Sequence, residues 1–229
     1  MKIGIIGAMQ MEVDNLKEAM ENQTITQVSG ISFVSGTIGN VEVVAAVCGV
    51  GKVFAAICAE AMILKFDVEM VINIGVAGTL TKDLGVLDVA VATQVMQHDM
   101  DTSALGDPVG LISGINQIFF ETDEKMRTIM CECLKDKGVK YLPGTIATGD
   151  LFVHDAEKKA QIRERFGAIA AEMEGGSIGH VCFVNQVPFL VLRAISDGDG
   201  GAMDYQTFAE KAAMVSIEVV LEFIERIAA

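Results

Sequence analysis

The chain has 229 residues, of which 51% are hydrophobic, and this is enough apolar material for one well-buried core. Its 31 acidic residues outnumber its 17 basic ones, so the formal net charge is −14. That balance excludes a nucleic acid or an anionic membrane as a partner, because too few cations are present to neutralise phosphate groups.

Apolar runs that are typical of buried strands alternate along the chain with segments of helical period. The first half predicts strand 2–7, helix 9–20, strand 41–48, helix 53–65, strand 69–74 and strand 86–97. An irregular stretch is expected over 98–117. The second half continues with helix 122–137, strand 139–148, helix 155–165, strand 168–171, helix 174–185, strand 188–195 and helix 204–228. Strands that are apolar on both faces and alternate with helices predict a single α/β domain over 1–229, with its sheet covered on both sides.

The helix over 122–137 has the clearest boundaries. Thr122 is its expected N-cap, Asp123 and Glu124 suit the positive end of the helix dipole, and Gly138 ends it. Its apolar residues recur at the i, i+3, i+4 spacing of one buried face.

Membrane and secreted proteins are excluded by the order of the residues. Polar residues interrupt each apolar run well before the ~20 residues that a membrane-spanning helix needs, and we expect no secretory signal at the start of the chain. The five cysteines have no framework spacing, which is typical of reduced thiols. We therefore expect a cytoplasmic protein.

Short segments that contain glycine or acidic residues follow several of the predicted strands. Ligands of α/β proteins bind beyond the carboxyl ends of strands, so we expect these segments to form one pocket. They are Gly7–Met9, Cys48–Gly51, Gly75–Gly78, Thr148–Asp150, Glu172–Glu174 and Ser196–Asp197.

Familiar cofactor motifs are not matched. The run that contains Gly4 and Gly7 lacks the GxGxxG spacing of a dinucleotide site, and VCGVGKV has Ala46 and Val53 where a phosphate-binding loop needs glycine and a hydroxyl group. The HDMD segment at His98 lacks a second ligand group, so a polar loop is the better interpretation than a metal site. We expect neither a metal nor an organic cofactor.

Acidic side chains at the strand ends are the strongest chemical signal. Glu12 and Glu174 begin predicted helices, where solvated acids are common, so each alone is neutral evidence. Asp197 ends an otherwise apolar strand that also holds Arg193, and a buried carboxylate costs free energy of desolvation unless it has a task. Acids gathered at one end of a sheet suit proton transfer and stabilisation of a cationic transition state. Cleavage of a glycosyl or N-ribosyl bond requires this combination.

Several segments occur in an order and spacing that resemble a known family. They are MKIGIIGAM followed by Glu12, GVGKVFAA, NIGVAG, HDMD, TGDLF, AAEMEG and VLRAISD. Together they resemble the 5′-methylthioadenosine/S-adenosylhomocysteine nucleosidases of the nucleoside phosphorylase superfamily, over essentially the whole chain. The resemblance implies one three-layer α/β domain whose twisted mixed sheet forms part of a barrel, assembled as a homodimer. It also implies cofactor-free hydrolysis of 5′-thio-substituted adenosines to adenine and the thioribose, in methionine salvage.

The same resemblance implies roles for the acidic residues and their neighbours. Asp197 would be the general acid that protonates the purine, with Ser196 orienting it. Glu12 would activate the attacking water, with Arg193 near that water. Glu174 would hold the ribose hydroxyl groups.

Substrate-binding roles are implied for apolar residues. Met173 would pack against the sugar, Phe152 would stack on adenine, and the backbone of Val153 would pair with the edge of the base. Val76 would lie near the water and the ribose. The side of the 5′-substituent would be lined by Met9, Val50 and Tyr205.

Two departures from the family leave other functions open. Val76 stands where the family usually has a small hydroxyl residue, and the loop over 100–114 lacks the family's aromatic residues. A futalosine hydrolase-like enzyme therefore remains an alternative. A phosphorylase would need a phosphate site, which Asn73 and Val76 do not supply. A non-catalytic nucleoside sensor would not need the water-activating and proton-donating acids that this chain keeps.

Overall fold

The computed structural model describes residues 1–197 and 202–228, with the side chains of 202–204 and 206 left out. The strands are β1 (Lys2–Gly7), β2 (Glu21–Val28), β3 (Ile31–Ile38), β4 (Val41–Val47), β5 (Met70–Asn73), β6 (Val76–Thr79), β7 (Val89–Gln97), β8 (Phe119–Glu121), β9 (Tyr141–Thr148), β10 (Ala168–Glu172) and β11 (Phe189–Asp197). The helices are α1 (Asp14–Glu18), α2 (Lys52–Phe66), α3 (Glu124–Asp136), α4 (Ala156–Phe166), α5 (Gly175–Asn185) and α6 (Ala202–Ile227). Two 3₁₀ turns are η1 (Gln10–Glu12) and η2 (Ser103–Leu105).

The strands form one mixed sheet with β11 near its middle. Its order is β2-β3-β4-β1-β5-β11-β6-β10-β9-β7-β8. β11 pairs in parallel with β5 and with β6, and it also pairs antiparallel with β7, where Arg193 lies opposite Ala90. This additional pairing closes β11, β6, β10, β9 and β7 into a ring. The expected twisted sheet with a barrel portion is therefore confirmed.

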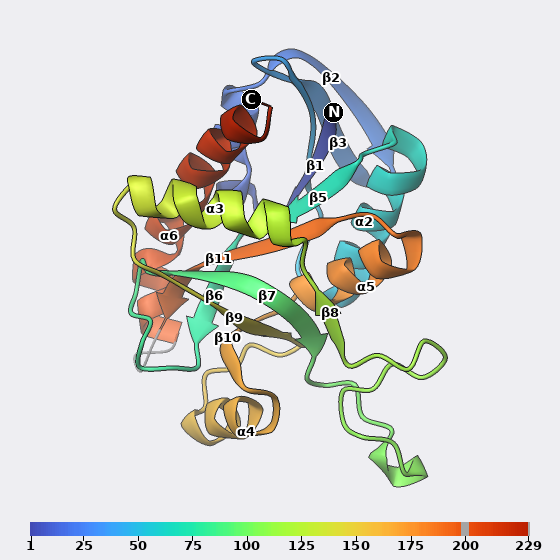
Figure 1. The fold of residues 1–229 in the computed structure, drawn as a ribbon, viewed down its shortest axis with the longest axis vertical. Helices are drawn as coiled ribbons and strands as arrows, with labels where there is room; N and C mark the ends of the chain where they lie inside the picture. Colours follow the sequence, from blue (N-terminus) through green and yellow to red (C-terminus); the bar gives the residue numbers. More distant parts are fainter. Residues whose placement is uncertain (198–201, 229) are drawn as a thin grey trace.

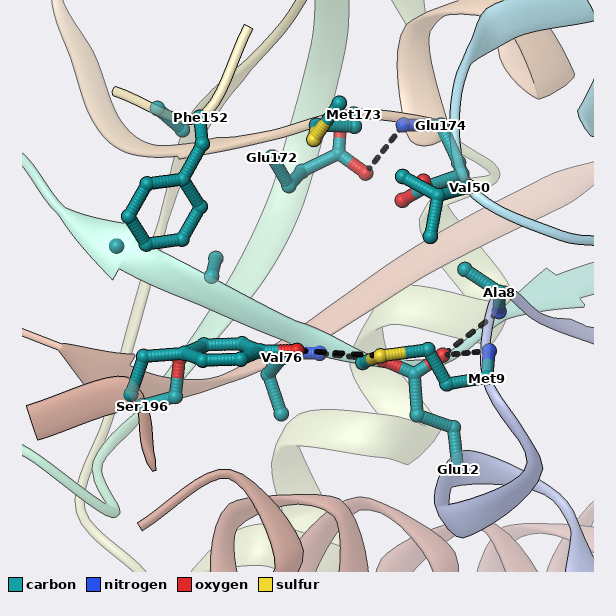
Figure 2. A pocket seen from close by; sticks show the side chains of 14 residues that line it. Ala8, Met9, Glu12, Val50, Val76, Phe152, Glu172, Met173, Glu174 and Ser196 are labelled. Carbon is teal, nitrogen blue, oxygen red and sulfur yellow. Dashed lines mark hydrogen bonds between the residues drawn. The ribbon is translucent and has the colours of Figure 1, made fainter. Parts of the chain in front are cut away.

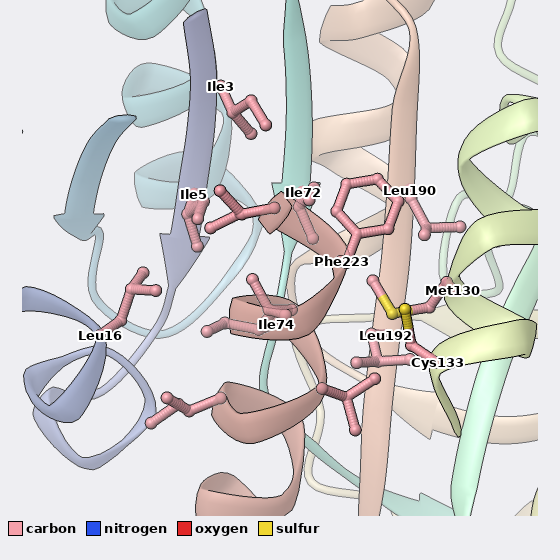
Figure 3. Packing of buried hydrophobic residues seen from close by; sticks show 14 of the residues in the cluster. Ile3, Ile5, Leu16, Ile72, Ile74, Met130, Cys133, Leu190, Leu192 and Phe223 are labelled. Atoms are coloured by element: carbon pink, nitrogen blue, oxygen red, sulfur yellow. The ribbon is translucent and has the colours of Figure 1, made fainter. Parts of the chain in front are cut away.

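Helices cover both faces of the sheet (Figure 1). On one face, Ile5 and Leu190 of the strands pack with Phe223 of α6 and Met130 of α3 (Figure 3). The other face is covered by α2 and α5. Burying each such side chain stabilises the fold by roughly 1.5–3 kcal/mol. The expected three-layer α/β architecture is confirmed.

The sequence prediction was wrong in two places near the N-terminus. A hairpin of β2 and β3 occupies residues 21–38, for which no element was predicted, because β2 is polar and largely exposed. The helix expected over 9–20 is instead η1 and the short α1. There the Glu12 carboxylate accepts hydrogen bonds from the backbone of Ala8 and Met9 and holds the chain in a turn.

The helices and the cysteines bear on the predicted class of the protein. Among the helices within residues 1–197 and 202–228, none is both long and apolar enough to cross a membrane. The five cysteines are free thiols, and all but Cys131 are buried. Burial raises the pKa of these thiols, Cys58 and Cys182 to about 12, so they are held in the unreactive neutral form.

Candidate active site

A cavity of about 220 Å³ opens beyond the carboxyl ends of β1, β4, β9, β10 and β11 (Figure 2). It gathers five of the six strand-end segments that the sequence predicts to meet; Thr148–Asp150 supplies no residue to its lining. The lining residues are Ala8, Met9, Glu12, Val50, Val76, Ala77, Gly78, Phe152, Ala171, Glu172, Met173, Glu174, Ser196 and Tyr205.

Glu12 lies on one side of the cavity, where backbone N–H groups fix its carboxylate (Figure 2). Ala8 N and Met9 N donate to Oε2 over 2.6 and 2.9 Å, and Val76 N donates to Oε1 over 3.2 Å. Gly75 leaves room for this approach, because a Cβ there would lie 2.8 Å from Oε1. Burial raises the pKa of Glu12, although a nearby guanidinium and the N–H groups oppose this. A carboxylate with a raised pKa is suited to accept a proton.

Glu174 lies on the opposite side of the cavity, just before α5 (Figure 2). Its Oε1 accepts a hydrogen bond from Gly51 N at the start of α2 over 2.9 Å, and its Oε2 lies 3.7 Å from Arg193 Nη2. Burial, followed by the charge of Glu172, raises the pKa of Glu174 to about 7. Two carboxyl groups with raised pKa values therefore face each other across the cavity.

Arg193 is buried on β11, and protein groups occupy most of its hydrogen-bonding capacity. Its guanidinium pairs with Glu172 and donates to the side-chain and backbone oxygens of Asn73. Glu172 also accepts from Gly175 N over 2.7 Å and from the Thr148 hydroxyl group. No role was predicted for Glu172; in the structure its carboxylate pairs with the Arg193 guanidinium and fixes it. The position of Glu172 beside Glu174, at the end of an apolar strand, is the feature of the sequence that could have indicated this role.

Asp197 ends β11 beside the cavity and is almost fully buried. Ser196 Oγ donates to Asp197 Oδ1 over 3.2 Å. A Cβ at Gly78 would lie 2.8 Å from Asp197 Oδ2, so this glycine lets the carboxylate approach β6. Because Ser196 and Gly78 both line the cavity, the carboxylate adjoins its wall.

Apolar and aromatic side chains form much of the remaining wall. The rings of Phe152 and Tyr205 meet edge to face, with centroids 5.6 Å apart and planes at 79°. The Tyr205 hydroxyl group donates to Met9 Sδ over 3.1 Å, and Met173 and Val50 also line the cavity. Such a surface can enclose a planar ring and an apolar substituent.

The structure brings most of the predicted site residues together. Nine of them line the cavity, Arg193 contacts the lining residues Glu172 and Glu174, and Asp197 adjoins the wall. The side chain of Val153 packs with Leu80 and other residues in a separate apolar cluster, so its predicted contact with the base concerns its backbone alone. The chemical roles of these residues stay predictions.

The HDMD segment has a structural arrangement. Asp99 accepts hydrogen bonds from Lys52 Nζ over 2.7 Å and from Asp150 N over 2.9 Å. His98 is buried, and this burial lowers its pKa. Within residues 1–197 and the described part of 202–228, no three His, Cys, Asp or Glu side chains gather as a metal site.

Comparisons with known proteins extend over the whole chain. The sequence profile of the phosphorylase superfamily matches residues 2–225. An aminodeoxyfutalosine nucleosidase from Campylobacter jejuni is 38% identical, over 99% of this chain and 100% of its own length. A 5′-methylthioadenosine/S-adenosylhomocysteine nucleosidase from Shewanella piezotolerans is 37% identical, with the same two coverages. The solved structure of such a nucleosidase from Helicobacter pylori, with butyl-thio-DADMe-Immucillin-A, has a TM-score of 0.94 and 37% identity and covers 98% of both chains.

Proposed function

Because the chain belongs to the phosphorylase superfamily, among its nucleosidases, we propose that it hydrolyses the N-glycosidic bond of methylthioadenosine and S-adenosylhomocysteine to adenine and the thioribose. One observation carries this proposal. Glu12 and Glu174 face each other across the cavity, and Asp197 adjoins its wall. Carboxyl groups on several sides of a largely apolar cavity suit a reaction whose transition state is a cationic sugar.

Departure of the base is assigned to Asp197. Its proton passes to the five-membered-ring nitrogen of the purine while the electron pair of the glycosidic bond moves onto the base. Ser196 orients the carboxyl group through its hydrogen bond to Oδ1. Phe152 stacks on the purine, and the Val153 backbone pairs with the edge of the base.

Attack of water on the sugar is assigned to Glu12. As the water oxygen bonds to the anomeric carbon, the Glu12 carboxylate accepts the proton that the water loses. Glu174 holds the ribose hydroxyl groups, and Met173 packs against the sugar. The negative charges of the two carboxylates stabilise the oxocarbenium-like transition state between them.

The cavity favours water over phosphate as the nucleophile. The described residues that line it include no Lys or Arg. The Arg193 guanidinium beside it is paired with Glu172 and Asn73, and Val76 offers no hydroxyl group. Carboxylates on two sides repel an anion. Hydrolysis is therefore proposed rather than phosphorolysis.

A second substrate class has a specific observation in its favour. The Campylobacter jejuni relative is an aminodeoxyfutalosine nucleosidase, and it is as similar to this chain as the methylthioadenosine nucleosidase from Shewanella piezotolerans. Val50, on the predicted side of the 5′-substituent, is half exposed, so that side of the cavity is open. Hydrolysis of a futalosine-type nucleoside is the second candidate.

One experiment separates these functions. The protein is incubated with methylthioadenosine, S-adenosylhomocysteine or aminodeoxyfutalosine, with and without phosphate, and the free base is quantified by chromatography. Adenine released from the thio-substituted adenosines without phosphate supports the main proposal, and release from aminodeoxyfutalosine alone supports the second. Base released only with phosphate, or binding without any release, contradicts both.

We also propose that the chain forms a homodimer in the cytoplasm and acts in methionine salvage, as the family resemblance implies. Exposed apolar side chains on α2 support the dimer, since Val53, Phe54 and Ile57 all lie on its first turns. α5 lies beside α2 and adds Val184 (Figure 1). Leu105, on η2 in the loop that extends from the body, is exposed as well. Exposed apolar side chains gathered on neighbouring helices are typical of a protein–protein interface.

A further inference from the structure

Lys159 contacts the carboxylate of Asp197 from a helix that supplies none of the predicted site residues. It lies on α4, and its Nζ is 3.5 Å from Asp197 Oδ2. The side chain of Lys159 is 14% exposed and that of Asp197 is 3% exposed. Because solvent screens a buried pair only weakly, the ammonium group acts strongly on this carboxylate.

Groups of β11, β6 and α6 also approach Asp197. Ser196 Oγ donates to Oδ1 over 3.2 Å, and β6 approaches through Gly78. From α6, burial raises the pKa of the Tyr205 hydroxyl group, and nearby carboxylates, including Asp197, raise it further. Lys159 brings a positive charge within ion-pair distance of this carboxylate.

We propose that Lys159 is a positioning residue for the general acid: it holds the Asp197 carboxylate at the cavity wall and sets the pH above which the acid loses its proton. The inference deepens the proposed function and rests on it. An adjacent ammonium group favours the ionised carboxylate, whereas burial alone favours the neutral acid. With Lys159 in place, Asp197 therefore retains a proton only up to a lower pH.

The test is the pH dependence of kcat and kcat/KM for the nucleoside that the wild type cleaves. In Lys159→Met, the side chain keeps its length and loses its charge. We expect the alkaline limb of the kcat/KM profile to move to higher pH by about one unit. Lys159→Arg keeps the charge and should leave the limb where it is.

Lys158→Met is the matched control. Lys158 is the neighbouring residue on α4, it is also partly buried, and its charge acts on His98. Removing it changes the net charge equally, so the limb should stay in place. A limb that does not move in Lys159→Met, or that moves equally in Lys158→Met, overturns the inference, even if kcat falls.

A second measurement does not depend on turnover. The melting temperatures of Lys159→Met, Asp197→Asn and the double variant form a cycle, and a held ion pair predicts that the two single shifts do not add in the double variant. Additive shifts overturn the inference. If the wild type cleaves no nucleoside, the proposed function fails, and the cycle alone still decides whether Lys159 holds Asp197.

Discussion

At the scale of single residues, three of the four carboxylates of the site, those of Glu12, Glu172 and Glu174, share the guanidinium of Arg193. Arg193 pairs most closely with Glu172, so little of its charge is left for Glu174 at 3.7 Å or for Glu12. One positive charge cannot offset three buried negative ones, and burial therefore raises the pKa of both Glu12 and Glu174. Glu174, with a pKa of about 7, can thus exchange a proton near neutral pH.

The raised pKa of Glu174 predicts a pH-dependent stability. Its pKa is about 7 in the folded protein and near its usual 4.5 in the unfolded chain, so the folded state binds this proton more tightly. The stability that it contributes is complete below pH 4.5 and is lost as the pH rises through 7. The loss is on the order of 3 kcal/mol. Glu174→Gln should lack this loss, so its melting temperature relative to wild type should rise between pH 5 and pH 8.

The exposed Glu18 supplies the control for that measurement. Glu18→Gln should melt in parallel with the wild type at every pH. If Glu174→Gln also runs parallel to the wild type, the raised pKa is wrong.

Asp197 carries the sharpest prediction on activity. Asp197→Asn keeps the size of the side chain and removes its acidic proton, so turnover should fall by about 10²–10⁴-fold. Binding of an adenine analogue, measured by calorimetry, should change only a few-fold, because Phe152 and the cavity wall remain. Near-normal turnover in this variant would refute the assignment of Asp197 as the acid.

Most residues of the site could be predicted from the sequence, but most of the ion pairs that hold them could not. Acids at strand ends are visible because a charge at the end of an apolar run is costly unless it has partners. The partners are less visible. Lys159 lies in a charged helix, and nothing in its local sequence shows that its side chain reaches Asp197 at the end of β11. The ion pair between Arg193 and Glu172 likewise joins two strands that are separated by α5 in the sequence and by β6 in the sheet.

At the scale of elements, periodic segments were predicted well and their ends less so. The N-cap of α3 lies one residue later than expected, because Asp123, rather than Thr122, accepts a hydrogen bond from Met126 N over 2.8 Å. Thr122 instead donates its hydroxyl proton to Ala92 O on β7. A cap depends on which of two neighbouring polar side chains tertiary structure uses, and local sequence does not contain that information.

Close packing of α5 on the sheet gives an element-scale prediction. A Cβ at Gly179 would lie 2.5 Å from Val95 Cγ2 on β7 and 2.9 Å from the ring of Phe189 on β11. Gly179→Ala should therefore lower the free energy of unfolding in urea by about 1–3 kcal/mol. Gly85→Ala is the control, since the nearest atom to its Cβ is 3.7 Å away. Equal stability of the two variants would show that α5 can shift without cost.

At the scale of the whole molecule, the alternation of strands and helices was sufficient to predict a three-layer domain. The closure of the sheet was expected only from the family resemblance, because the pairing of β7 with β11 joins residues about a hundred positions apart. The buried length of β11 follows from that closure: its first half pairs with β5 and its second half with β6 and β7. β11 therefore contributes buried residues to the core of the sheet and, at its end, Asp197 to the candidate site.

In this three-layer arrangement, α2 keeps an exposed apolar face on the side away from the sheet. Val53 and Ile57 are one helical turn apart and are 70% and 39% exposed. In a homodimer that buries them, the double variant Val53→Glu, Ile57→Glu places two carboxylates in the interface without partners, at a cost of several kcal/mol. Light scattering should then report a monomer where the wild type is a dimer. Ile25→Glu, at an equally apolar and 66% exposed position on the edge strand β2, should remain a dimer with wild-type activity. A wild type that is monomeric, or a double variant that stays dimeric, would show that this face of α2 is not the interface.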